Sequence, residues 1–139
     1  MRTRIAASLA LQGLMQTLKV TLLEVSAGSV TLELPISDAV SQHNGFVHAG
    51  AIASLLDSAC GFAALSVMPQ DSDVLAVEFK INFVAPAVGV ALRAVAEVVK
   101  AGRTITLCTA RAFAVSEDGA LKLVAVMQGT MIRVARSSP

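Results

Sequence analysis

Aromatic and charged residues are scarce in this sequence. Its 139 residues include no Trp, no Tyr and five Phe, and only 15% are charged. The charges nearly cancel, to a net +1, and no block of like charge occurs. A nucleic-acid-binding surface needs clustered cations that neutralise phosphates, and a disordered chain needs a larger share of charged residues. The sequence therefore predicts a folded protein with no nucleic-acid partner.

Cysteine and histidine are equally sparse. Cys60 and Cys108 are isolated within apolar runs, which indicates buried thiols in a reducing compartment and no disulfide framework. His43 and His48 lie five residues apart with no Cys or acidic residue at ligand spacing, so they do not form a metal site. Phosphate-binding loops, dinucleotide fingerprints and GxSxG serine motifs are also missing. We expect a cytoplasmic protein with no metal and no cofactor.

Aliphatic residues dominate instead. Hydrophobic residues make up 55% of the chain, and the mean hydropathy is +0.70. One domain is expected at this length, and so apolar a chain has more apolar surface than one core can hide. Residues 49–68 have the length of a bilayer span, but Asp57 at their centre costs about 2.5–3.5 kcal/mol on insertion, and basic flanks and aromatic belts are absent. We therefore expect burial against another subunit and no membrane partner.

Hydrophobic periodicity predicts an α+β fold. Alternating residues indicate strands near 18–22, 30–34, 75–83, 90–100, 105–115 and 121–134. One long apolar helix is predicted over 49–67 and ends before Pro69. Residues 1–16 indicate a short N-terminal helix, and residues 135–139 a frayed tail. Short turns favour antiparallel neighbours, so we predict a single domain, 1–139, with about six strands curved around the helix.

Asp57 is the most informative single residue. A carboxylate inside an apolar helix is costly unless it is paired, and burial raises its pKa. Asp57 either bonds to a neighbouring backbone group or a water pocket, or is a reactive acid. The predicted helix start at His48, Ala49 and Gly50 favours the second interpretation, because free N–H groups there polarise a carbonyl oxygen. Small side chains also let a ligand approach the backbone.

These two features cannot act together within one chain. Ala49 and Asp57 are eight residues apart, which is about 12 Å along a helix at 1.5 Å per residue. If both act on one carbonyl group, they belong to different chains. A two-fold dimer with antiparallel neighbouring helices brings Ala49 of one subunit near Asp57 of the other, twice. The same dimer uses the surplus of apolar surface.

The residues around this helix start resemble a known family. Gln42-x-x-Gly45-x-x-His48-Ala49-Gly50, with Asp57 seven residues further on, is similar to the signature of hotdog-fold acyl-CoA thioesterases, especially the phenylacetyl-CoA thioesterase group. Residues 76–86 and 99–104 also match, and the similarity runs from about 18 to 132. The resemblance implies a hotdog fold and hydrolysis of an acyl-CoA thioester. It further implies a homodimer at minimum, with a dimer of dimers as the expected assembly. Coenzyme A is part of the substrate and not a cofactor.

The resemblance also implies roles for individual residues. Asp57 matches the acidic residue, acting either as a nucleophile or as a general base for water, and the backbone N–H of Ala49 matches the oxyanion donor, where relatives usually have Gly. Gln42 matches an Asn or Gln that orients the thioester or the water, or else it ties down its own loop. His48 either bonds near the thioester sulfur or caps the helix.

Five further residues are expected to contact the substrate: Gly45, Gly50, Gly61, Lys100 and Arg103. Lys100 and Arg103 flank a hairpin turn that lies near the CoA phosphates in similar proteins. Gly61 leaves room beside Asp57, but it stands where some relatives carry a Ser or Thr that helps to place the water. The missing hydroxyl leaves a non-catalytic acyl-CoA-binding hotdog protein as an alternative. A hotdog hydratase or dehydratase is a weaker one, because the proline-rich surroundings of that motif are absent.

Overall fold

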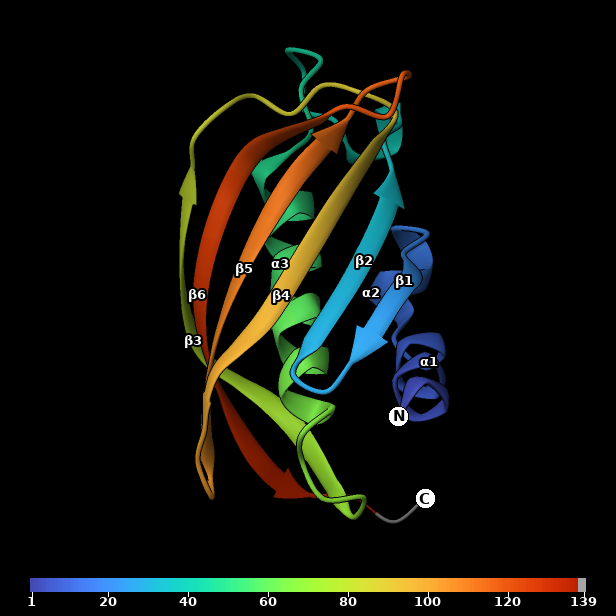
Figure 1. The fold of residues 1–139 in the computed structure, drawn as a ribbon. Coiled ribbons are helices and arrows are strands. Elements are labelled where there is room, and N and C mark those ends of the chain that lie inside the picture. Colours follow the sequence, from blue (N-terminus) through green and yellow to red (C-terminus); the bar gives the residue numbers. More distant parts are fainter. Residues whose placement is uncertain (138–139) are drawn as a thin grey trace.

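A computed structural model describes residues 1–137 and has a curved six-stranded sheet around one long helix (Figure 1). The elements are α1 (Arg2–Ala10), α2 (Gly13–Thr17), β1 (Thr21–Ser26), β2 (Ser29–Pro35), a 3-10 turn (Asp38–Val40), α3 (Ala49–Leu65), β3 (Ser72–Phe83), β4 (Ala91–Ala101), β5 (Ile105–Val115) and β6 (Leu121–Ala135). Every strand pairing is antiparallel, in the order β1-β2-β4-β5-β6-β3. The predicted α+β class, with six strands around one long helix, is confirmed.

The helix α3 is the centre of the core. It contacts β2, β3, β4, β5 and β6, so the sheet encloses most of its circumference. Its most deeply buried side chains are fully inaccessible to solvent: Leu55, Leu56, Ala59, Cys60, Ala63 and Ala64. Three of these are alanines, which favour helix and let strands approach the helix axis closely. Only a stripe that includes Ser54, Asp57, Ser58 and Gly61 stays partly accessible, on the side that the sheet leaves open.

The N-terminal segment folds as two helices, where the sequence predicted one. α1 ends at Ala10, and Gln12 takes an extended conformation that redirects the chain before α2 begins at Gly13. The first strand consequently starts at Thr21 and not near Leu18. Residues 18–20 instead close the end of α2, where the N–H of Val20 bonds to the carbonyl of Met15 at 2.9 Å. Apolar spacing alone does not separate a helix end from a strand start.

The strand β3 lies at an edge of the sheet and not beside β4. It pairs with β6, and residues 84–90 cross the end of the sheet to reach β4 (Figure 1). The prediction that short turns join neighbouring strands is therefore wrong for this connection. A seven-residue segment containing Pro86 is long enough to cross, whereas a tight turn forces neighbours to pair. β3 is left with one unpaired side and a bulge between Ala76 and Glu78.

The C-terminal strand is slightly longer than predicted. β6 continues through Ala135, and the N–H of Arg136 still bonds to the carbonyl of Asp71 at 2.9 Å. Of the predicted tail, residues 138 and 139 lie outside the described part of the chain. Among the helices within residues 1–137, none is long and apolar enough to cross a membrane.

Arg4 fastens α1 to the end of the central helix. Its guanidinium donates hydrogen bonds of 2.8–3.2 Å to the carbonyls of Leu65, Met68, Pro69 and Ser72. The last carbonyls of a helix lack intrahelical donors and carry partial negative charge, which a cation stabilises. We expect Arg4→Ala to lower the free energy of unfolding by about 1.5–3 kcal/mol, measured by urea denaturation at fixed protein concentration.

Arg2→Ala is the matched control. Arg2 also donates two hydrogen bonds to carbonyls, those of Leu22 and Leu23, but it is exposed and does not contact the end of α3. Its loss should cost about 0.5 kcal/mol or less. Equal losses for the two variants would contradict a specific role of Arg4 at the helix end.

Candidate functional site

His48 caps the N-terminus of α3. Its Nδ1 accepts a hydrogen bond of 2.7 Å from the N–H of Gly50, and its carbonyl accepts from the N–H groups of Ala51 and Ile52. A Cβ at position 50 would lie 3.0 Å from Nδ1, so glycine makes room for the imidazole. Of the two roles considered for His48, the structure contains the cap. Gly50 makes room for this cap, and that role of Gly50 was not predicted from the sequence.

The N–H of Ala49 is left as a free donor. Ala49 is the first residue of α3, where the amide has no intrahelical acceptor. No acceptor within residues 1–137 bonds to it, and Ala49 is exposed at the edge of a pocket. An unpaired amide at the positive end of a helix stabilises negative charge on a ligand oxygen. The geometry therefore suits a carbonyl that gains negative charge.

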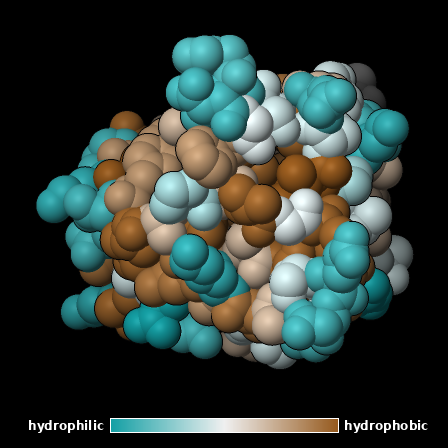
Figure 2. All heavy atoms as spheres, turned by 90° about the horizontal axis from the view of Figure 1, so that it is seen from above, coloured by the Kyte–Doolittle hydropathy of each residue, from teal (hydrophilic) through white to brown (hydrophobic). Residues whose placement is uncertain are grey.

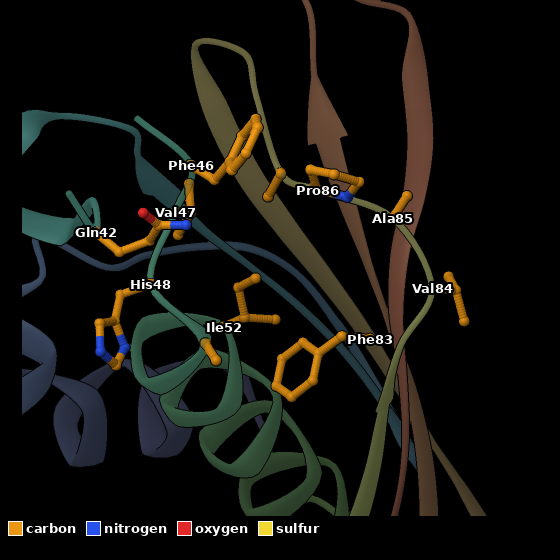
Figure 3. Close-up of a pocket in the computed structure, with 11 residues that line it drawn as sticks. Gln42, Phe46, Val47, His48, Ile52, Phe83, Val84, Ala85 and Pro86 are labelled. Carbon is orange, nitrogen blue, oxygen red and sulfur yellow. The ribbon is translucent and has the colours of Figure 1, made fainter. Parts of the chain in front are cut away.

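A pocket of about 550 Å³ lies against this helix start. The loop before α3 forms one wall, with Phe46 and Val47, and the segment after β3 forms the other, with Phe83 and Pro86. Figure 3 shows Phe46, Ile52, Phe83 and Pro86 around one space. Seen from this end of the molecule, hydrophobic surface gathers in the middle and hydrophilic groups lie around its rim (Figure 2). Such a lining suits an apolar or amphipathic ligand.

Gln42 borders this pocket and also holds its own loop. Its Oε1 accepts a hydrogen bond from the N–H of Asn44, and its carbonyl accepts from the N–H of Gly45 at 3.0 Å. Gly45 adopts a φ of +85°, which a tight turn requires and which glycine tolerates. The Nε2 of Gln42 meets no acceptor among the described residues. One side chain thus fixes the loop and keeps a donor beside the pocket.

Asp57 lies in a second, smaller pocket of about 110 Å³, together with Gln12, Ser58 and Gly61. Its Oδ1 is buried and accepts no hydrogen bond from the described residues. Burial raises the pKa of the Asp57 carboxyl above its ordinary value of 3.8. A Cβ at Gly61 would meet only Val74, at 3.9 Å, so there is open space beside the acid. A carboxylate with a raised pKa and an unused acceptor is suited to taking a proton.

The structure brings the predicted residues together in two separate groups. Gln42, His48 and Ala49 share the larger pocket, while Asp57 and Gly61 share the smaller one, and no residue lines both. Lys100 and Arg103 are exposed on the β4–β5 hairpin and line none of the pockets described here. Figure 1 places that hairpin at the opposite end of the molecule from the start of α3. One chain alone therefore does not unite the predicted site.

Sequence reasoning missed two contributors. Gln12 reaches the pocket of Asp57 only because the chain turns between α1 and α2, and nothing in the local sequence signals this contact. Residues 83–87 were predicted as a strand end and a turn. Their role as a pocket wall does not show in the sequence, because it depends on how the chain crosses to β4. Within residues 1–137, no group of three or more His, Cys, Asp and Glu side chains is placed to hold a metal ion.

The raised pKa of Asp57 has a consequence for stability. At neutral pH, folding moves a charged carboxylate into a partly buried site without a hydrogen bond for Oδ1, which opposes folding. Below about 3.8 the group is protonated in both states, so the cost disappears. We expect Asp57→Asn to raise the melting temperature at pH 7, and this gain to shrink as the pH falls through the raised pKa.

Asp118→Asn is the control of opposite sign. Hydrogen bonds from the Ser116 hydroxyl and from the N–H of Ala120 lower the pKa of Asp118. Its charged form thus favours folding above its ordinary pKa, and this contribution is lost as the pH falls through the lowered value. We expect this variant to lower the melting temperature at pH 7. A gain for Asp57→Asn that does not vary with pH would contradict the burial argument.

Comparison with known proteins finds a matching family and solved structures with the same fold. The profile of the Thioesterase superfamily matches residues 44–120. A thioesterase family protein from Silicibacter pomeroyi shares 41% identity and superposes with a TM-score of 0.93, covering 97% of this chain and 98% of that one. A Bacillus halodurans protein whose structure was solved with CoA shares 29% identity at a TM-score of 0.69, covering 75% of this chain and 66% of its own.

A curated relative matches over a shorter region. A protein from Halobacterium salinarum, named as a candidate esterase, is 33% identical over 98 residues, which are 67% of this chain. The match spans 64% of the length of that relative. The matched family segment includes His48, Ala49, Asp57 and Gly61, and excludes Gln12 and Gln42.

Proposed function

The chain belongs to the Thioesterase superfamily, and on that basis we propose that it hydrolyses an acyl-CoA thioester to the free acid and CoA. The family and the hotdog fold inferred from the sequence are confirmed. The proposal depends most on one observation: among residues 1–137, nothing bonds to the N–H of Ala49 or to Oδ1 of Asp57, and each group lies in its own pocket. An oxyanion donor and a base or nucleophile are the two groups that speed hydrolysis of a thioester.

We propose a two-fold dimer as the form that unites them. The separation of about 12 Å along α3 is fixed by helix geometry, so only a partner with an antiparallel α3 places Asp57 opposite Ala49. The unpaired edge of β3 supports this arrangement, because it exposes four large apolar side chains: Leu75, Val77, Phe79 and Phe83. An open apolar edge strand is suited to pairing with a second copy. A dimer of dimers remains a prediction from the resemblance.

In the proposed mechanism, the thioester carbonyl accepts a hydrogen bond from the N–H of Ala49, and the side chain of Gln42 lies beside that carbonyl. The amide and the positive helix end stabilise the oxyanion more strongly than the neutral carbonyl, which lowers the barrier. Asp57 of the partner chain acts either as the nucleophile or as the general base that takes a proton from water. In the general-base route, the proton held by Asp57 passes to the thiolate of CoA as the C–S bond breaks. In the nucleophilic route, cleavage of the C–S bond leaves an anhydride on Asp57 and the thiolate takes a proton from solvent; water then hydrolyses the anhydride to the free acid and restores the carboxylate. His48 serves both routes by fixing the helix start.

The acyl-CoA substrate class is supported by shape and by similarity. The larger pocket is lined mainly by apolar side chains and opens at the helix start, so it suits an amphipathic thioester arm. The Bacillus halodurans protein that shares this fold was solved with CoA. A two-fold axis that reverses α3 also moves the partner's β4–β5 hairpin toward this end. Lys100 and Arg103 of that hairpin are then the cations expected near the phosphates.

A non-catalytic acyl-CoA-binding protein is the second candidate. It is favoured by the open space at Gly61, where no side chain is present to position a water molecule. The two candidates differ in one measurement, which is release of free thiol from a panel of aryl and aliphatic CoA esters. Binding without thiol release would favour the second.

Ala49→Pro tests the oxyanion donor alone. Proline lacks the N–H, yet its fixed φ is well suited to the first position of a helix. The preceding His48, with φ −61° and ψ 137°, already has the extended conformation that proline requires of its neighbour. We expect kcat to fall about 10²–10³-fold with an unchanged melting temperature. Activity equal to that of the unmodified protein would overturn the assignment.

Mixing two inactive variants tests the shared site. A mixture of Ala49→Pro and Asp57→Asn chains, unfolded and refolded together, forms heterodimers in which one site has both groups intact. Random assembly in equal amounts should restore about one quarter of the unmodified activity. Light scattering should show a dimer for each variant alone, and each alone should stay inactive. A mixture without activity would show that the site is not shared.

A further inference from the structure

The turn between α1 and α2 carries Gln12 to the pocket of the proposed general base. It lines the 110 Å³ pocket that holds Asp57 and Gly61, although 45 residues separate it from the acid. Its backbone is fixed, because its N–H bonds to the carbonyl of Leu9 and its carbonyl accepts from the N–H of Gln16, both at 3.1 Å. Its side-chain amide makes no hydrogen bond to the described residues. The amide is therefore anchored at its base and free at its tip.

The corner that carries Gln12 is firmly held. The Nε2 of Gln16 bonds to the carbonyl of Leu9 at 3.2 Å, across the corner between α1 and α2. Leu9 and Met15 are buried on either side of it, with 6% and 1% of their surfaces exposed. Arg4 ties α1 to the carbonyls at the end of α3. The position of Gln12 relative to α3 is thus set by the core and not by a loose terminus.

A hydrolytic water in this pocket needs a second polar partner besides Asp57. A volume of about 110 Å³ holds at least one water molecule, which needs two or more polar partners to stay ordered. Asp57 supplies one acceptor, and Gly61 supplies no side chain. Ser58 borders the same pocket but follows Asp57 directly on the helix, so it lies on the same wall. Gln12 enters from another element and offers both an acceptor and a donor.

We propose that Gln12 is a positioning residue that holds the attacking water against Asp57, in the space that Gly61 leaves open. This inference rests on the proposed hydrolysis and assigns Asp57 as the general base. The water donates one hydrogen to the Asp57 carboxylate and the other to Oε1 of Gln12, which leaves a lone pair for the thioester carbon. As the C–O bond forms, Asp57 takes the proton. When the C–S bond breaks, that proton passes to the thiolate of CoA.

Gln12→Ala tests the assignment, with Gln16→Ala as the matched control. Loss of a water-positioning contact should lower kcat about 10–100-fold and leave KM and the melting temperature unchanged. Gln16→Ala removes a hydrogen bond that holds the same corner, so it should lower the melting temperature and leave kcat unchanged. If Gln16→Ala lowers kcat as much as Gln12→Ala, the effect of Gln12 is structural and the proposal fails.

Two further variants test whether residue 12 lies close to the attacking water and to Asp57. Gln12→Glu keeps the shape but places a second carboxylate in the pocket, which should move the acid limb of the kcat/KM profile to higher pH. Gly61→Ser fits the open space and supplies a hydroxyl, so it should restore part of the kcat lost in Gln12→Ala. An unmoved acid limb, or no recovery, contradicts the assignment. A loss in Ser58→Ala without one in Gln12→Ala would assign the water to Ser58 instead.

Asp57→Asn separates the failure of this inference from failure of the proposed function. If Asp57→Asn abolishes thiol release while Gln12→Ala keeps the unmodified kcat, only the role of Gln12 is overturned. If the unmodified protein releases no thiol from any CoA ester, the proposed hydrolysis fails; if Asp57→Asn keeps full activity, hydrolysis stands but the role of Asp57 fails. The role of Gln12 then fails with it, because no base would be left to activate the water.

Discussion

The enclosure of one apolar helix by a curved sheet is the constraint on which the rest of this structure depends. The helix α3 must bury leucine, alanine and cysteine side chains on most of its circumference, and five strands supply the surface that buries them. A sheet that curves around a helix leaves one side open, and the partly accessible residues Ser54, Asp57, Ser58 and Gly61 form a stripe there. The same packing fixes both ends of the helix, so the chemical groups along it are held rigidly.

Rigidity has a cost for a reaction that needs two groups at one point. The rise of the helix keeps the backbones of Ala49 and Asp57 about 12 Å apart along its axis, which is more than the short side chain of Asp57 spans. The two groups lie in separate pockets, where no residue of the described part of the chain bonds to the N–H of Ala49 or to Oδ1 of Asp57, and burial raises the pKa of the acid. Under the proposed dimer, each chain would supply half of two sites. The apolar edge of β3 would then be covered by the partner that completes the chemistry.

The N-terminal segment both attaches to the central helix and lines the pocket of Asp57. It lies outside the segment matched by the family profile, and its sequence shows only a short amphipathic stretch. In three dimensions, Arg4 stabilises the far end of α3, and the corner after α1 presents Gln12 beside Asp57. A stabilising attachment and a functional contact thus depend on one helical corner. Under the proposed function, this corner compensates for the side chain that Gly61 does not have.

The sequence by itself determined the elements and the chemistry of single residues. Alternating apolar residues located the strands, and a long, mostly apolar run located α3. Asp57 was conspicuous because a charge inside such a run is costly. These are local properties, which spacing of three to ten residues encodes. Only the tertiary structure decided which distant segments meet: β3 pairs with β6, residues 83–87 form a pocket wall, and Gln12 lines the pocket of the acid. Such contacts depend on the direction that the chain takes after a crossing segment or a helical corner. The local hydrophobic pattern does not encode that direction.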